Sequence, residues 1–267
     1  MVVKTKTNRG GMGLSAIVTA STLLAVVLGV SAHAASAAAS GVRHEPRLLE
    51  PKLTLEASLD HVPTVALTFD ACMGKVDERI LSLLIDHHIP STVFVTARWI
   101  KRNPDALALM LANAELFEIE DHGENHVPAI DRPMTVFGIA AAGSSEAVAA
   151  EVEGGAAAIL AAGAEHPLWF RGATAKYTES AVTQIEGLGY RIAGYSINGD
   201  GGSLLGARAV ERQYARAKDG DVIISYINQP SHQAGEGVVK GIMELESRGF
   251  RFVRLKDRAE DPTARSF

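Results

Sequence analysis

The 267-residue sequence predicts an α/β fold, a distorted (β/α) barrel of about seven parallel strands in a single domain. Short apolar runs alternate along the chain with longer segments whose apolar residues recur at helical spacing, as in parallel strands joined by helices. The short runs are rich in Leu and Val, which is typical of strands buried on both faces. A doubly wound open sheet is the competing architecture. Because no Gly-x-Gly-x-x-Gly follows the first run, its dinucleotide-binding version is disfavoured.

The first 34 residues have the features of a secretory signal peptide. Three basic residues precede an uncharged, largely apolar run at 14–30, and Ala32-His33-Ala34 offers small residues for cleavage. An uncleaved membrane anchor is the alternative, because the run is nearly long enough to cross a bilayer. Cleavage predicts an exported protein, periplasmic or extracellular, without stable membrane association.

The rest of the chain divides into a low-complexity linker and lead-in at 35–60, a folded domain at 61–256 and a C-terminal tail at 257–267. Within the domain, short apolar and β-branched runs predict the strands. They are expected at 65–69, 92–95, 116–119, 168–170, 191–195, 222–224 and 251–253.

Helices are predicted between these strands, at 77–86, 104–113, 145–162, 178–188, 207–217 and 237–248. The first has Ile80, Leu83 and Leu84 at helical spacing. The second opens with Pro104, which is tolerated in a first turn. The third is Ala-rich but contains two adjacent glycines that weaken it, and glycines close the fourth and the sixth.

Charge and cysteine content exclude several classes of protein. The net charge is −5, and removing the first 34 residues takes away three positive charges and no negative ones, which leaves −8. Such an acidic protein has no electrostatic reason to bind nucleic acid or an anionic membrane. With Cys72 as its single cysteine it cannot form an internal disulfide, so its stability must come from the core.

Polar side chains follow five of the predicted strands, and barrels carry their chemistry at the carboxyl ends of strands. These residues are Asp70, His122 with His126, Arg171, Asp200, and Tyr226 with Asn228. If the backbone makes one helical turn between the two histidines, both imidazoles leave the same face and can bind one divalent ion. The spacing alone is a weak signal, but the convergence of polar groups on one rim strengthens it.

Five segments, in this order, resemble the polysaccharide deacetylases of carbohydrate esterase family 4. They are Leu67-Thr68-Phe69-Asp70, His122-x-x-x-His126, Arg171 after Trp169-Phe170, Asn198-Gly199-Asp200-Gly201 and Gly220-Asp221-Val222-Ile223-Ile224. The likeness covers roughly residues 61–256. It implies a distorted (β/α) barrel with a divalent metal, commonly zinc, that removes acetyl groups from N-acetylated sugars.

The resemblance also implies a role for each matching residue. His122 and His126 match the histidine ligands of the metal. Asp70 matches the general base, Arg171 the arginine that orients this base, and Asp200 the carboxylate that in turn fixes the arginine.

The first departure from the family concerns the metal. The second Asp of the family's Thr-Phe-Asp-Asp motif, a metal ligand, is Ala71 here. Asp70 could therefore be ligand or base, and Asp77 is another candidate ligand unless it is only a helix N-cap. Because some family members carry an Asp-Ala-Cys form of this motif, we interpret Ala71 as a subfamily trait. Cys72 could be a soft ligand, although a small buried hydrophobe is the more common role.

The second departure concerns the proton donor. The family's general acid is a histidine, and Tyr226 stands at that position. Tyrosine is normally protonated, with a pKa near 10, and can donate a proton. His232 could substitute if its loop folds inward; otherwise it is a solvated loop residue. The family's Arg-x-Pro segment also lacks its proline after Arg171, which loosens a turn.

The sequence thus predicts a secreted deacetylase that acts on an N-acetylated or O-acetylated polysaccharide and depends on a divalent metal, most often Zn²⁺, with Co²⁺ as an alternative. A catalytically impaired member that binds carbohydrate in the same cleft is the alternative function. The glycan, the choice between amide and ester, and the oligomeric state stay open at this point.

Overall fold

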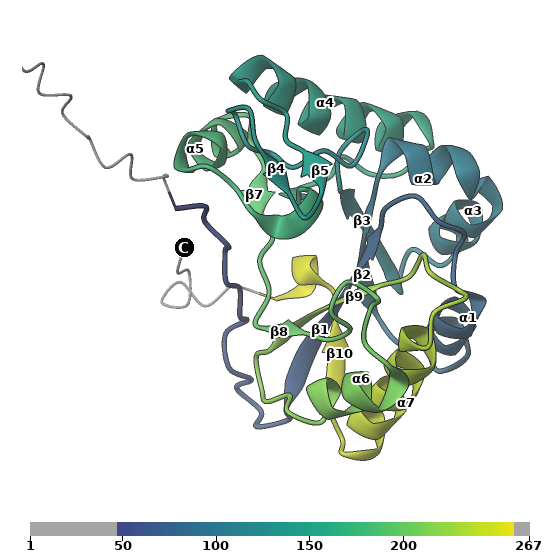
Figure 1. Ribbon diagram of the computed structural model, residues 1–267. Coiled ribbons are helices and arrows are strands. Elements are labelled where there is room, and N and C mark those ends of the chain that lie inside the picture. The colour runs from purple at the N-terminus through teal and green to yellow at the C-terminus, as the bar shows by residue number, and fades with distance from the viewer. Residues whose placement is uncertain (1–46, 259–267) are drawn as a thin grey trace, which may run out of the picture. The chain divides into compact units, whose positions relative to one another are not determined.

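Seven parallel strands curl into a half-barrel in the order β7-β6-β3-β2-β1-β9-β8 (Figure 1). The computed structural model describes residues 47–258, so the predicted signal peptide lies outside the described residues. A further strand, β10, pairs in parallel with the first residues of β1. The strands of this sheet are β1 (Thr64–Ala71), β2 (Ser91–Val95), β3 (Phe117–Asp121), β6 (Trp169–Phe170), β7 (Arg191–Ile192), β8 (Ile197–Asn198), β9 (Val222–Tyr226) and β10 (Arg251–Val253).

The described residues also form seven α-helices and two short 3₁₀ helices. The α-helices are α1 (Glu78–Asp86), α2 (Ala97–Arg102), α3 (Pro104–Ala112), α4 (Ser145–Ala161), α5 (Glu179–Gly187), α6 (Ala207–Tyr214) and α7 (Ala234–Ser247). The 3₁₀ helices are η1 (Ala173–Ala175) and η2 (Leu255–Asp257). None of these helices is both long and apolar enough to cross a bilayer.

The predicted fold class is confirmed, because the domain is a single curled sheet of seven parallel strands with a helix in each predicted interval. Three kinds of element were not predicted. These are the six-residue α2, the two-residue β8, and the antiparallel hairpin of β4 (Thr135–Val136) and β5 (Ile139–Ala140). All are too short to show a periodic pattern, and α2 depends on a cap in which Thr96 accepts a hydrogen bond from the Trp99 N–H.

Every residue of β1 is buried, and its side chains alternate between two layers. Phe69 and Ala71 pack into the core between sheet and helices. Ala66 points to the opposite face of the strand and belongs to a second core inside the half-barrel. Thr68 and Asp70 continue on that inner face toward the carboxyl end of the strand, because successive side chains of a strand point to opposite faces.

The segment before β1 covers the open side of the half-barrel. It makes two antiparallel bridges, Leu49 with Tyr177 and Thr54 with Asp221, and it buries Leu53 and Leu55 in the inner core. The chain here passes so close to Gly194 that a Cβ on that residue would lie 2.3 Å from the carbonyl oxygen of Pro51. This segment therefore belongs to the structure around the site.

Candidate active site

The two histidines come together, but on a backbone that differs from the prediction. His122 directly follows β3, and the residues from His122 to His126 form an irregular loop, not a helical turn. Gly123 (φ 89°) and His126 (φ 63°) both adopt positive φ. The imidazole centroids nevertheless lie 5.1 Å apart. The two rings are therefore close, as the spacing predicted, although the helical turn that was assumed as the way to bring them together does not form between His122 and His126.

Glu151 of α4 holds this loop. Its carboxylate is buried and accepts hydrogen bonds from the backbone N–H groups of Asn125 (3.0 Å) and Val127 (2.9 Å), the residues on either side of His126. The two contacts satisfy backbone donors that a helical turn would have paired internally. They therefore stabilise the positive φ of His126 and fix the backbone from which its ring projects.

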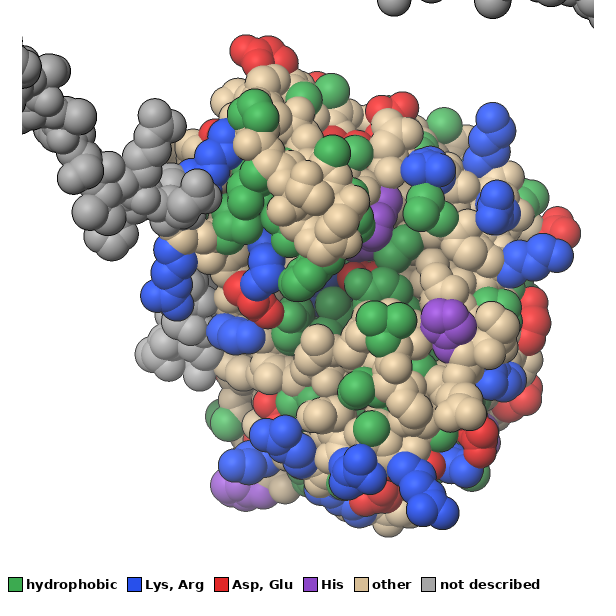
Figure 2. All heavy atoms as spheres, in the orientation of Figure 1, with side chains coloured by type: hydrophobic (Ala, Val, Ile, Leu, Met, Phe, Trp, Pro, Cys, Tyr) green, Lys and Arg blue, Asp and Glu red, His purple; other side chains and the backbone are tan. Residues whose placement is uncertain are grey.

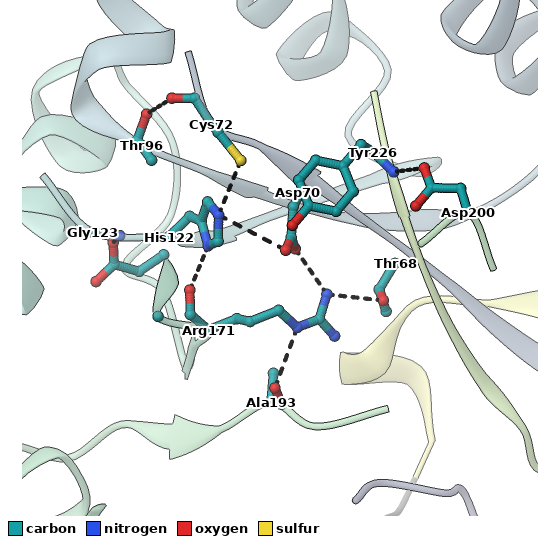
Figure 3. A network of polar contacts seen from close by, with 12 residues as sticks. Thr68, Asp70, Cys72, Thr96, His122, Gly123, Arg171, Ala193, Asp200 and Tyr226 are labelled. Atoms are coloured by element: carbon teal, nitrogen blue, oxygen red, sulfur yellow. Dashed lines mark hydrogen bonds and ion pairs between the residues drawn. The ribbon is translucent and has the colours of Figure 1, made fainter. Parts of the chain in front are cut away.

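The tautomer of His122 follows from its contacts. Its Nδ1 lies 2.5 Å from the carbonyl oxygen of Arg171, and a carbonyl can only accept. Nδ1 therefore carries the proton and donates it, which leaves a lone pair on Nε2. That lone pair faces Cys72 Sγ at 3.4 Å and Asp70 Oδ2 at 3.8 Å (Figure 3). A histidine whose second nitrogen donates to a carbonyl is the usual arrangement of a metal ligand.

His126 presents a second imidazole nitrogen to the site. Its Nε2 is buried and has no hydrogen-bond partner among residues 47–258, which is costly for a polar atom. Burial, together with His122, lowers the pKa of His126 to about 4, so the ring is neutral at physiological pH. The donor atoms of Cys72, His122 and His126 all lie within 4.8 Å of one another. Neutral imidazoles with an unsatisfied nitrogen fit a divalent ion, so these residues suit the metal that the sequence predicted.

Asp70 and Arg171 form a buried ion pair beside the histidines. Arg171 Nη1 donates to Asp70 Oδ1 and to Thr68 Oγ1, both at 3.0 Å (Figure 3). Its remaining contacts are to the carbonyl oxygens of Ala193 (3.2 Å) and Gly194 (3.0 Å). Arg171 thus orients one oxygen of Asp70 and leaves Oδ2 directed toward His122.

The predicted role of Asp200 is wrong, because none of these hydrogen bonds of Arg171 goes to Asp200. Its carboxylate accepts instead from the backbone N–H groups of Tyr226 (2.7 Å) and Ser203 (3.1 Å). Burial raises the pKa of Asp200 to about 6. Asp200 therefore positions the backbone of Tyr226, while main-chain carbonyls take over the task of fixing the arginine.

Tyr226 lies at the site, whereas His232 and Asp77 are engaged elsewhere. Tyr226 stands opposite Asp70 in the register of β9 and β1, and burial raises the pKa of its phenol well above the ordinary value, followed by the effect of Asp70. His232 Nδ1 donates to the carbonyl oxygen of Ser203, and His232 does not line the cavity described below. Asp77 caps α1 and pairs with Arg79 at 2.5 Å. The geometry thus keeps Tyr226 as a donor candidate and gives Asp77 its N-cap role.

A cavity of about 490 Å³ opens above these groups. Figure 2 shows a hollow near the middle of the face, with hydrophobic side chains around it. Two residues that line the cavity, Phe137 at the tip of the β4-β5 hairpin and Leu204, are 78% and 81% exposed. The lining residues are Glu50, Asp70, His126, Phe137, Ile139, Thr174, Ala175, Lys176, Tyr195, Asn198, Gly201, Gly202, Leu204, Ile224 and Tyr226.

Two residues of the site were not predicted as such. Cys72 was expected to be a buried hydrophobe, and Glu151 was not expected at the site at all. The alternation of β1 was the available signal for Cys72, since a residue two positions after Asp70 continues the inner face. No pattern in the sequence marks Glu151, because its partners are backbone groups 24 and 26 residues away. Such contacts appear only when the helix docks.

Comparisons with known proteins agree with this geometry. A family model described as polysaccharide deacetylase matches residues 59–193, and no curated protein sequence matches the chain. PdaA of Bacillus subtilis, a family 4 carbohydrate esterase, has a TM-score of 0.62 at 18% identity over 77% of this chain and 83% of its own.

Two further solved structures are similar. A family 4 carbohydrate esterase from Streptomyces lividans, in complex with acetate, has a TM-score of 0.60 at 16% identity over 77% of this chain and 97% of its own. A pseudoenzyme of the same family from Bacillus anthracis has a TM-score of 0.60 at 18% identity over 74% and 65%. At these identities the structures establish the fold, and they include both esterases and a pseudoenzyme.

Proposed function

The chain belongs to the polysaccharide deacetylase family, and from this premise we propose that it is an exported, metal-dependent enzyme that removes acetyl groups from an N-acetylated or O-acetylated polysaccharide. One observation carries the proposal. The unpartnered Nε2 of His126 and the oriented Nε2 of His122 lie beside a carboxylate that Arg171 aims at them. We further propose that the chain represents the Asp-Ala-Cys form of the family.

The chemistry divides among the residues of the site. His122 and His126 would hold the divalent ion, which lowers the pKa of a water molecule and polarises the acetyl carbonyl when it is bound. Asp70 would accept a proton from the attacking water through Oδ2, the oxygen that Arg171 does not bind. Tyr226, whose raised pKa keeps its phenol protonated, donates a proton to the departing amine. An amide needs this donation because an amide anion does not leave.

The test measures acetate released from acetylated chito-oligosaccharides, peptidoglycan and O-acetylated xylan. We expect release that stops after chelation and returns with Zn²⁺ or Co²⁺. His126→Ala, which removes one ligand, is expected to abolish it. Release that is equally fast after complete metal removal, or no release from any acetylated glycan, contradicts the proposal. Cell fractionation and N-terminal sequencing of the mature protein test export and cleavage after residue 34.

A second function is favoured by one specific feature. The proton-donating histidine of the family is replaced by Tyr226, and the solved structures of this fold include a pseudoenzyme. In this alternative the cleft binds carbohydrate without hydrolysis. Calorimetric titration with chito-oligosaccharides distinguishes the two, since sugar affinity without acetate release in the metal-loaded protein supports binding alone.

A further inference from the structure

Cys72 lies at the centre of the metal site although it was expected to be a core residue. It follows directly after β1, where the alternation that turns Phe69 and Ala71 toward the helices turns Asp70 and Cys72 toward the inside. Its side chain is buried, and its Sγ points at His122 (Figure 3). It is also the only cysteine of the chain.

The backbone around Cys72 is fixed from two sides. The Thr96 hydroxyl donates to the Cys72 carbonyl oxygen. With its amide oxygen facing the loop, Asn228 accepts from the N–H groups of Cys72 (3.3 Å) and Met73 (3.2 Å). The approach is so close that a Cβ on Gly74 would lie 1.9 Å from the Asn228 carbonyl oxygen. The backbone that carries the thiol is therefore fixed without any ion, which is what a preorganised ligand requires of its support.

The distances favour sulfur over the nearby carboxylate. A sulfur at 2.3 Å and a nitrogen at about 2.0–2.1 Å from one tetrahedral zinc lie about 3.5 Å apart. Cys72 Sγ and His122 Nε2 are separated by 3.4 Å. A carboxylate oxygen and a nitrogen on the same ion lie about 3.4 Å apart, whereas Asp70 Oδ2 is 3.8 Å from His122 Nε2 and the other Asp70 oxygen is bound by Arg171.

We propose that Cys72 is the third protein ligand of the metal centre, which binds a divalent ion through one sulfur and two imidazole nitrogens. The inference rests on the proposed function, since it assumes that the ion predicted there binds at His122 and His126. It removes the conflict that Ala71 creates, because Asp70 no longer has to serve as ligand and base at once. A thiolate ligand also favours soft ions such as Zn²⁺ over hard ones such as Mg²⁺ or Mn²⁺.

The test uses Co²⁺ as a spectroscopic probe. Metal-free protein is titrated with Co²⁺ under argon, with bound cobalt measured by equilibrium dialysis. We expect an intense near-ultraviolet thiolate-to-cobalt charge-transfer band that saturates at one ion per chain. Because the chain has one cysteine, this band can come only from Cys72. Bound cobalt at the histidines without the band overturns the inference and leaves a metal-dependent deacetylase intact.

Two variants form a matched pair. Cys72→Ser is expected to lose the band and to weaken Zn²⁺ binding by more than about 100-fold, beyond the 10–100-fold effect of altering groups around a ligand. Asp70→Asn is expected to keep the band while losing acetate release. The reverse result, with zinc affinity lost in Asp70→Asn and unchanged in Cys72→Ser, makes Asp70 the ligand and overturns the inference. Failure of the wild type to bind any divalent ion overturns both this inference and the proposed metal dependence.

Discussion

The Asp70-Arg171 pair is the residue-scale feature on which the site depends. Both side chains are almost completely buried, and Arg171 makes hydrogen bonds to four different residues. Its guanidinium also lies 4.2 Å over the ring of Phe94. A lysine could supply the positive charge, but not the planar set of N–H donors with which the guanidinium reaches these residues.

Arg171→Ala is expected to lower the free energy of unfolding by about 3–5 kcal/mol, because it leaves a buried carboxylate without its partner. Arg171→Lys is expected to be less destabilising. Arg251→Ala is the matched control, since its pair with Asp60 is about half exposed and such exposed pairs contribute little to stability. Urea denaturation measures all three, and equal losses for Arg171→Ala and Arg251→Ala contradict the assignment.

Tyr226→Phe tests the proton donor with a change of one oxygen. If the phenol protonates the leaving amine, kcat for an N-acetylated sugar is expected to fall by about 10²–10⁴-fold. An aryl acetate, whose leaving group needs no proton, should be hydrolysed at nearly the wild-type rate. Comparison of the two substrates at unchanged thermal stability gives the answer, and equal losses on both would assign Tyr226 to positioning.

At the scale of elements, α4 sets the shape of the loop that carries His126. The glycines that weaken this helix in the sequence are positions where it approaches the loop. A Cβ on Gly155 would lie 2.0 Å from Asp121 Oδ1 and 2.8 Å from the carbonyl carbon of Gly123. Since backbone atoms are involved, a side chain there cannot be accommodated by a rotamer change.

Gly155→Ala is therefore expected to push α4 away from the loop, to destabilise the fold by about 1–3 kcal/mol and to weaken metal binding. Gly187→Ala, in α5, is the control because nothing lies within 4 Å of a Cβ there. The free energy of unfolding of Gly187→Ala should equal that of wild type or exceed it by up to about 1 kcal/mol. Thermal unfolding and zinc competition measure both effects. A Gly155→Ala protein with normal stability and metal affinity would show that the close approach is dispensable.

At the scale of the whole molecule, the inside of the half-barrel carries two buried glutamates on β3, in addition to the Asp70-Arg171 ion pair. Glu118 accepts from the Thr92 hydroxyl (2.6 Å), and Glu120 accepts from the backbone N–H groups of Leu168 (2.8 Å) and Trp169 (2.7 Å). Burial, followed by the charge of Glu118, raises the pKa of Glu120 to about 9. Glu120 is therefore protonated in the folded protein at neutral pH.

This raised pKa makes stability fall as pH rises. The folded protein holds a proton that the unfolded chain releases near pH 4.5, so the contribution is complete below about pH 4.5 and is lost by about pH 9. Within that window the loss approaches about 1.4 kcal/mol per pH unit. Glu120→Gln, which keeps an acceptor for both N–H groups, should remove this dependence and exceed wild-type stability at pH 8. The free energy of unfolding is measured against pH for wild type and Glu120→Gln. Two parallel profiles would contradict the raised pKa of Glu120.

Most of the barrel was predictable because its strands bury both faces and its helices are long enough to show their period. The short apolar runs around Val65, Val93 and Ile119 are typical of parallel strands that are buried on both faces. The short elements α2 and β8 were not predicted, because contacts with distant residues contribute to holding them. Besides its local cap, α2 donates from the N–H groups of Ala97 and Arg98 to the carbonyl oxygens of Gly123 and Glu124, and β8 pairs with β9. The predicted strand at 191–195 is only two residues long, because the chain leaves the sheet at the Gly194 contact with the lead-in segment.

The sequence by itself determined the fold class and the set of polar residues at the rim. Strands and helices show in the periodicity of neighbouring residues, and the residues at the carboxyl ends of parallel strands gather on one rim of a barrel. It also determined that His122 and His126 would be near one another. The tertiary structure decided which atoms face which: Asp200 turns to the Tyr226 backbone, Arg171 to the carbonyl oxygens of the two residues after β7, and Cys72 toward His122. These outcomes depend on packing between segments 22 to 101 residues apart, from Arg171 with Ala193 to Arg171 with Asp70, and no local pattern encodes them.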